Sequence, residues 1–266
     1  MNILARVLLV SILLLGICAP LVAPHGFAEM SRDEALSGPS RTHLLGTDEE
    51  GRDRFSRLVY GIRISLMLAP VAAGLTTLIA ALLGALAARR GGFLDRAFLM
   101  LADALLCIPW MFLLISVRAL LPLNSDASLS VAVTFLLLAS LGWAGAARVV
   151  RVRVRNLLQR EDQLWRRASG IRNTRSLFIH LAPNLWPVMK SQFWLAVPAF
   201  ILSESNLSMI GLGVSEPLPS LGNLIHDLEN MGAVKQAPWL LAPLAVLVLV
   251  LLLLHAATNQ KRTQNA

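Results

Sequence analysis

Residues 148–184 read RVVRVRVRNLLQREDQLWRRASGIRNTRSLFIHLAPN, a polar stretch in a chain that is otherwise largely apolar. The stretch holds nine arginines against two acids, Glu161 and Asp162, so its net charge is +7, while the whole chain carries +8. Lys and Arg residues close to the ends of membrane spans stay on the cytoplasmic side. We therefore expect this stretch to form a cytoplasmic loop between two spans.

The apolar residues gather into runs of about 20, the length that a helix needs to cross a bilayer. Hydrophobic residues make up 56% of the 266 residues and charged residues only 15%, against about a quarter charged in soluble domains. The chain is therefore predicted to be an all-α polytopic membrane protein with about six transmembrane helices. We place these spans at residues 1–23, 64–88, 97–121, 129–147, 185–207 and 239–257. The loops expected inside hold most of the Lys and Arg, so both termini are predicted to be cytoplasmic.

The chain is divided into two regions at residue 62. Residues 1–62 are expected to form the first transmembrane helix and a polar outer segment with an interfacial helix. Thr47 and Glu50 have the spacing of a capping box at the start of that helix, and apolar residues follow at helical spacing (Phe55, Leu58, Val59 and Ile62). Residues 63–266 are expected to form a five-helix transmembrane core that carries the cytoplasmic loop 148–184.

Several classes of enzyme leave sequence signatures that are absent here. The chain has no GxxxxGK[ST] phosphate loop, no HExxH and no GxSxG. Its two cysteines, Cys18 and Cys107, form no metal-binding pattern, and the basic residues lie between spans without an aromatic platform for nucleic acid. We expect no catalytic residue, no metal and no nucleic-acid partner. An intramembrane hydrolase of the serine type stays open as a less favoured alternative.

Polar residues inside the predicted spans are candidates for a translocation pathway. These residues are Asp103, Ser203, Glu204 and Asn206. A charged side chain in the middle of a bilayer costs at least about 2.5–3.5 kcal/mol on insertion scales, so such residues often have a function. Hydrogen bonds or ion pairs that hold the helices together are the alternative, and both interpretations stay open.

The centre of the basic stretch has the pattern of a helix, a glycine and a second helix. Apolar residues recur at roughly helical spacing up to Gly170, and a second helical run ends near Pro183. A rigid projection of this kind suits docking onto another protein. An interfacial helix that rests on anionic lipid is the alternative.

Several segments, which cover nearly the whole chain from His43 onward, resemble the second-type permease subunit of ABC importers for dipeptides, oligopeptides and nickel. The matching segments are HLLGTDEEGRDRFSRLVYGIRISL (43–66), GGFLDRAFLMLADALLCIPWMFL (91–113), GWAGAARVVR (142–151) and LSESNLSMIGLGVSEPLPSLGNLI (202–225). Several ordered matches of this length are specific to the family.

The resemblance implies the ABC importer permease fold in a bacterial cytoplasmic (inner) membrane. The implied function is ATP-driven, binding-protein-dependent import of peptides, or of nickel or a similar small solute, by alternating access. The implied partners are a second homologous permease, two cytoplasmic ATPase subunits that hold ATP and Mg²⁺, an extracytoplasmic solute-binding protein and the lipid bilayer. The chain itself would hold no cofactor. A self-contained secondary transporter or channel is the alternative, although the sequence has no internal repeat of the kind common in such proteins.

The resemblance also implies that part of the basic stretch couples the chain to the ATPase. The implied coupling residues are Glu161, Leu164, Trp165, Arg166, Arg167, Ala168, Gly170 and Pro183. Arg167, Ala168 and Gly170 match the family's motif, whereas residues 164–166 replace its Glu-Ala-Ala. Bulky side chains at residues 165 and 166 do not fit a groove shaped for two alanines, so the sequence leaves the matching ATPase and the substrate open.

Overall fold

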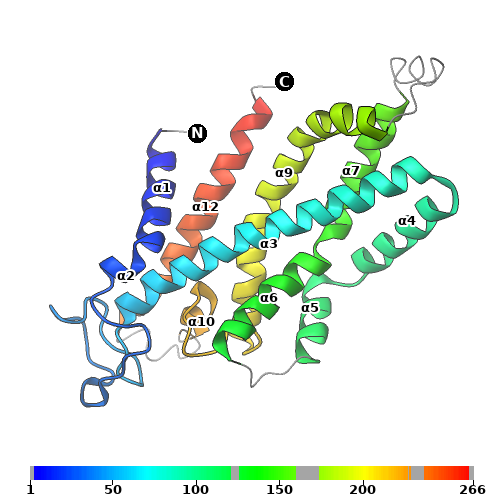
Figure 1. Ribbon diagram of the computed structural model, residues 1–266. Helices are drawn as coiled ribbons and strands as arrows, with labels where there is room; N and C mark the ends of the chain where they lie inside the picture. Colours follow the sequence, from blue (N-terminus) through cyan, green and yellow to red (C-terminus); the bar gives the residue numbers. More distant parts are fainter. Residues whose placement is uncertain (1–2, 121–125, 160–173, 227, 229–236, 264–266) are drawn as a thin grey trace. The chain divides into compact units, whose positions relative to one another are not determined.

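The protein is almost entirely helical in residues 3–120, 126–159, 174–226, 228 and 237–263, which its computed structural model describes (Figure 1). The α-helices are α1 (Ile3–Ile17), α2 (Ala19–Val22), α3 (Arg54–Arg90), α4 (Gly92–Cys107), α5 (Trp110–Ala119), α6 (Ala127–Leu141), α7 (Trp143–Leu158), α9 (Thr174–Met209), α10 (Leu221–His226) and α12 (Ala242–Thr263). Short 3-10 helices occur at Arg32–Glu34 and Pro238–Leu241. Within these residues the backbone forms no β-strand, and the predicted all-α fold class is confirmed.

Four helical stretches are long and apolar enough to cross a membrane. They are Arg54–Arg90, Ala127–Leu158, Ala182–Met209 and Pro238–Ala256. The pair α4 and α5 gives a fifth span if the two helices are counted together, and the apolar part of α1, Val7–Ile17, is shorter. The described helices thus account for four or five of the predicted spans, and a count of six stays a prediction.

The predicted third span is broken in two. α4 and α5 meet at an angle of 90° at a break between Cys107 and Trp110. Pro109 explains the break, because proline lacks an amide hydrogen and forces the preceding residue out of the helical conformation. Ile108 is accordingly extended, with φ −80° and ψ 127°. The predicted span over residues 97–121 is therefore made of two helices and not of one continuous helix.

The start of α3 differs from the predicted capping box. The carboxylate of Asp53 accepts a hydrogen bond from the backbone N–H of Ser56 at 2.7 Å and so caps the helix. The hydroxyl of Thr47 instead donates to the backbone carbonyl of Glu34. The helix expected after Thr47 consequently forms the first turns of α3, which continues to Arg90.

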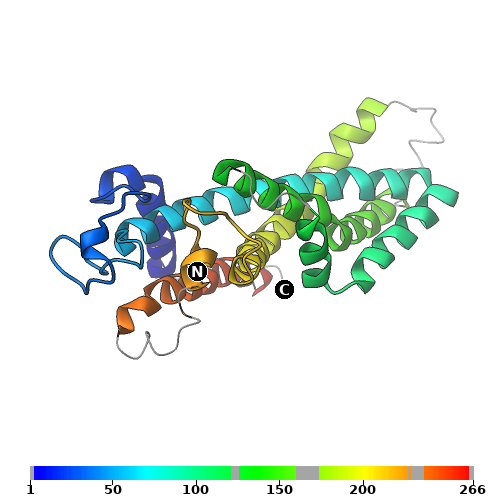
Figure 2. The same cartoon turned by 90° about the horizontal axis from the view of Figure 1, so that it is seen from below.

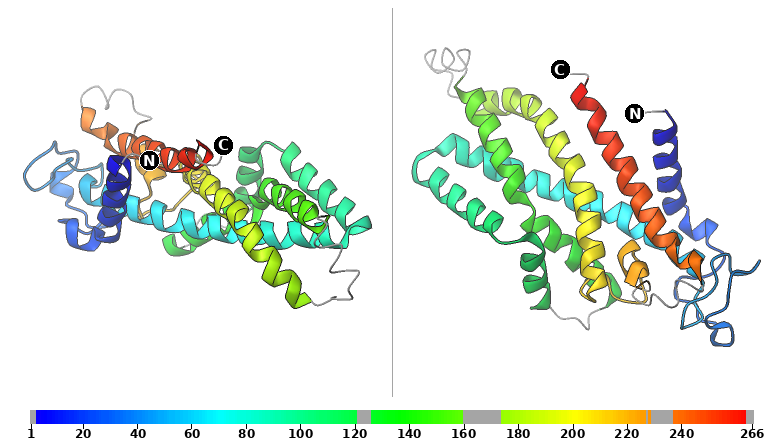
Figure 3. Two further views of the ribbon diagram at one scale, coloured as in Figure 1. Left: turned by 90° about the horizontal axis from the view of Figure 1, so that it is seen from above. Right: turned by 180° about the vertical axis from the view of Figure 1, so that it is seen from behind.

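The chain divides into two compact units. Unit 1 comprises Met1–Pro70, Ile115–Leu136 and Pro198–Ala266, and unit 2 comprises Val71–Leu114 and Leu137–Val197. In unit 1, α1 lies beside α12, and α10 also packs on α12 (Figure 1 and Figure 3).

Unit 2 is organised around α7, which runs alongside α4 (Figure 2) and also packs against α3. One core cluster consists of Ala80, Ala102, Trp143, Ala144 and Ala147. A second cluster consists of Val150, Val154, Leu157 and Leu185. Small side chains let helix backbones approach closely, and the approach is closest at Gly84. A β-carbon on this residue would lie only 2.5 Å from the carbonyl oxygen of Ala147.

We predict opposite effects of alanine at two helical glycines of unit 2. Gly84→Ala should lower the free energy of unfolding by about 1–3 kcal/mol, the usual cost of overpacking. Gly145→Ala should raise it by up to about 1 kcal/mol, because alanine is the better helix former and a β-carbon there meets nothing within 4 Å. Thermal unfolding of the purified protein in mild detergent measures both changes. Equal unfolding midpoints for the two variants would contradict the close approach at Gly84.

Candidate functional site

The stretch 148–184 is not a loop at its two ends. α7 continues through Arg148 to Leu158, and α9 begins at Thr174. Val150, Val154 and Leu157 are buried at helical spacing along α7, so the apolar face of this helix continues among the arginines. The expected helix–glycine–helix at Gly170 lies outside the described residues.

Most of the implied coupling residues lie outside the described residues as well. They are Glu161, Leu164, Trp165, Arg166, Arg167, Ala168 and Gly170. The remaining one, Pro183, lies within α9 and is exposed. The structure therefore describes α7 and α9, the two helices on either side of residues 160–173, which we call the coupling segment. The coupling roles of these residues stay predictions.

Three arginines of α7 pair with two acids of α4. Asp95 accepts two hydrogen bonds from Arg151, from Nε and Nη2, each at 2.5 Å, and Arg155 lies 3.7 Å away. Asp103 pairs with Arg148 at 2.7 Å, and both side chains are about half exposed. Asp103, a pathway candidate, thus takes part in an ion pair between helices.

The three candidates on α9 do not share one environment. Ser203 and Glu204 are buried in unit 1, whereas Asn206 is exposed. The Ser203 hydroxyl donates to the carbonyl of Ala199, and Ser208 donates to Glu204 at 2.7 Å. Asn206 is therefore the one of these three candidates whose side chain is exposed.

Arg118 is a buried residue to which the sequence gives no role. Its side chain, 1% exposed, donates from Nε to the carbonyl of Leu212 and from Nη2 to the hydroxyl of Ser130, both at 2.9 Å. Ser130 in turn donates to the carbonyl of Gly213 at 3.2 Å. Arg118 and Ser130 thus hold the turn that follows α9. An arginine within an apolar helix was the one signal that could have found it.

The same turn is tied to the polar segment before α3. The carboxylate of Glu216 accepts a hydrogen bond from Arg52 at 2.8 Å and two from Arg57 at 2.8 and 3.0 Å. Arg52 also donates to Asp48 at 2.7 Å. Asp48 therefore belongs to a network of ion pairs within unit 1. No group of three or more His, Cys, Asp or Glu residues suited to a metal occurs in the described part of the chain.

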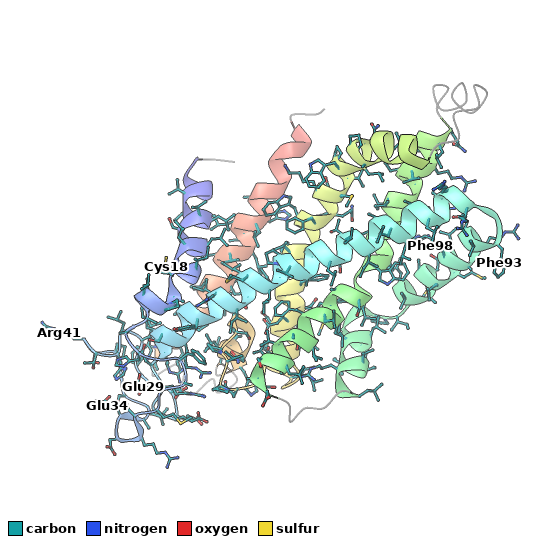
Figure 4. All side chains as sticks on the ribbon, in the orientation of Figure 1. Cys18, Glu29, Glu34, Arg41, Phe93 and Phe98 are labelled. Atoms are coloured by element: carbon teal, nitrogen blue, oxygen red, sulfur yellow. The ribbon has the colours of Figure 1, made fainter. Side chains whose placement is uncertain are left out.

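A histidine lies between two carboxylates in the polar segment. His43 Nδ1 lies 3.0 Å from the carboxylate of Asp53, and Nε2 lies 2.9 Å from that of Glu34. Glu34 is labelled in Figure 4. The ring of His25 stacks on His43, with centroids 4.8 Å apart. The hydrogen bond with Asp53, with a further contribution from Glu34, raises the pKa of His43 above its usual value although burial opposes this.

Comparison with known proteins adds the decisive observation. The family model "Binding-protein-dependent transport system inner membrane component" matches residues 80–261. The chain belongs to this family. This permease chain is 33% identical over 233 residues to the oligopeptide transport system permease protein of Bacillus subtilis, covering 88% of the chain and 74% of that relative.

Two further relatives agree with this assignment. A dipeptide transport system permease protein of Alkalihalophilus pseudofirmus is 31% identical over 234 residues, which are 88% of the permease chain and 74% of the relative. The oligopeptide transport system permease protein of Mycobacterium tuberculosis is 32% identical over 247 residues, with 91% and 83% covered. The predicted family resemblance is confirmed.

The stability of this permease should depend on pH through His43. Because its folded pKa is raised, the protonated ring stabilises the fold fully below the unfolded value of about 6.5, and this contribution is lost as pH rises through the folded pKa. The difference in unfolding temperature between wild type and His43→Gln should therefore shrink between pH 6 and pH 9. Differential scanning fluorimetry in detergent measures it. A difference that stays constant over this range would show that His43 does not titrate there.

Proposed function

We propose that this chain is one of two permease subunits in an ATP-driven importer that takes peptides, or nickel or a similar small solute, from a binding protein. Peptides are proposed as the substrate because two of the relatives are named as oligopeptide and dipeptide transport system permease proteins. Membership of a transport family supports this function over a self-contained ion-driven transporter or an intramembrane hydrolase.

The proposed mechanism is alternating access. A ligand or nucleotide can shift a two-state protein only by binding the two states with different affinity. In this proposal ATP and Mg²⁺ act on the two partner ATPases, and the loaded binding protein acts on the opposite side of the membrane. The permease pair converts both events into inward- and outward-open states.

The proposed location is the bacterial inner membrane, with both termini in the cytoplasm. Basic residues support this orientation, because Arg89 and Arg90 lie in the last turn of α3 and Arg155 lies in the last turn of α7. The polar segment 24–53 and the turn after α9 would then face the binding protein.

Capture of the ATPase tests the coupling segment. Wild-type chain, purified in mild detergent with its partner permease, should retain the ATPase pair, and an Arg167→Glu, Gly170→Pro double variant should lose at least about 90% of it. A reversed charge and a broken helix remove the proposed docking surface. Arg96→Gln, an exposed arginine on α4, is the control and should retain the ATPase.

Two outcomes count against this proposal. A wild-type chain that purifies without an ATPase would favour the self-contained transporter. A double variant that holds the ATPase as well as wild type would place docking elsewhere in the chain.

Substrate contact by Asn206 can be tested by import kinetics. Asn206→Ala should raise the KM for peptide import into proteoliposomes about tenfold, since one hydrogen bond is worth roughly 1.4 kcal/mol. Leu202→Ala, 43% exposed one turn earlier on α9, is the matched control and should leave KM within about twofold. Equal KM values for the two variants would remove Asn206 from the pathway, with Asp103, Ser203 and Glu204 the remaining candidates.

A further inference from the structure

Unit 2 contains a helix, α4, that has a break in the backbone at each end. α4 is preceded by Gly91 and begins at Gly92, with φ of 61° and 58°, and a β-carbon on either would meet nothing within 4 Å. At its other end, the 90° break at Ile108 and Pro109 separates it from α5. Neither end continues into a neighbouring helix, so side-chain contacts must fix the position of α4.

These contacts are made largely with α7. Asp95 pairs with Arg151 near the start of α4, and Asp103 pairs with Arg148 two turns later. Since the residue number rises along α4 while it falls along α7, the two helices are antiparallel. Phe98, which lies between Asp95 and Asp103 on α4, packs against Trp143 on α7 with ring centroids 6.0 Å apart, whereas Phe93 is 81% exposed (Figure 4).

The two ion pairs differ in strength. The Asp95 and Arg151 side chains are only 13% and 11% exposed and meet through two parallel hydrogen bonds. Such a bidentate pair fixes the relative orientation of its partners as well as their distance. The Asp103–Arg148 pair has one contact and is about half exposed, where solvent weakens an ion pair. Asp95–Arg151 is therefore the contact that fixes α4 on α7.

We propose that the ion pair between Asp95 and Arg151 holds α4 rigidly on α7, so that the two helices move together. The inference rests on the proposed importer function, because α7 leads directly into the coupling segment. A displacement of that segment by the ATPase is then carried through α7 to α4, and from α4 to the break at Pro109. Both are positioning residues, which contact neither substrate nor nucleotide.

The proposal is tested by the number of ATP molecules that are hydrolysed per peptide imported. In proteoliposomes that contain the whole importer, Asp95→Asn and Arg151→Gln should each raise the ATP hydrolysed per peptide imported at least tenfold, while the complex stays assembled. The control Arg96→Gln removes a charge next to Asp95 on an exposed face and should leave this ratio within about twofold. A purely structural role would instead lower ATP hydrolysis and import in proportion.

A second test replaces the ion pair by a covalent crosslink between α4 and α7. In a chain with Cys18 and Cys107 replaced by alanine, an Asp95→Cys, Arg151→Cys variant should be uncoupled, and a short bis-maleimide crosslinker should recover at least half of the import. The proposal would be overturned if the crosslinked variant stayed uncoupled. It would also be overturned if Asp95→Asn hydrolysed as much ATP per peptide imported as wild type.

A distance measurement covers the case in which these variants fail to assemble. Spin labels at the exposed positions Met100 on α4 and Val152 on α7 should keep one narrow distance distribution in the apo and ATP-trapped importer. A shift between the two states would overturn the proposal. A wild-type complex without import or ATP hydrolysis would instead count against the importer function, so the two failures are distinguishable.

Discussion

The need to pair every polar backbone group shapes this structure most strongly, because an apolar surrounding offers no water to do so. Helices satisfy most of these groups internally, but each turn between helices leaves carbonyls exposed. At the turn after α9, Arg118 and Ser130 supply the missing donors to Leu212 and Gly213. A buried arginine that would be costly alone thus replaces the water that the turn lacks, from a position 94 residues earlier in the chain.

Several buried charges in the described residues are paired across long separations in sequence. Arg52 and Arg57 share Glu216, which follows them by 164 and 159 residues. Arg151 reaches back 56 residues to Asp95. Removing one partner of a buried pair usually costs more than the pair contributes to stability, because the other charge is left unpaired. These pairs therefore help to fix which segments are neighbours within each unit.

The sequence predicts what is local and misses what is long-range. Runs of apolar residues place the long helices, because length and hydropathy are properties of a single segment. Pro109 is visible in the sequence, but the 90° break depends on how the two half-helices pack. Thr47 and Asp53 are both suitable N-caps, and the choice depends on Glu34, whose carbonyl binds Thr47. The partner of Glu216 could not have been found from one sequence without an alignment.

The arginine-rich stretch shows how charge can conceal a helix. Its count of arginines favours a loop, yet Val150, Val154 and Leu157 are buried on one face of α7. Arg151 is buried as well, whereas Arg148, Arg153 and Arg155 are exposed. The stretch Ala127–Leu158 has 32 residues, or about 48 Å of helix at 1.5 Å per residue, against a hydrocarbon thickness of about 30 Å. The stretch is therefore longer than a bilayer crossing requires, and its final turns remain helical up to Leu158. A helix transmits a displacement along its length where a flexible loop would absorb it. The arginines from which a cytoplasmic position is predicted therefore lie on the element that would carry the proposed motion.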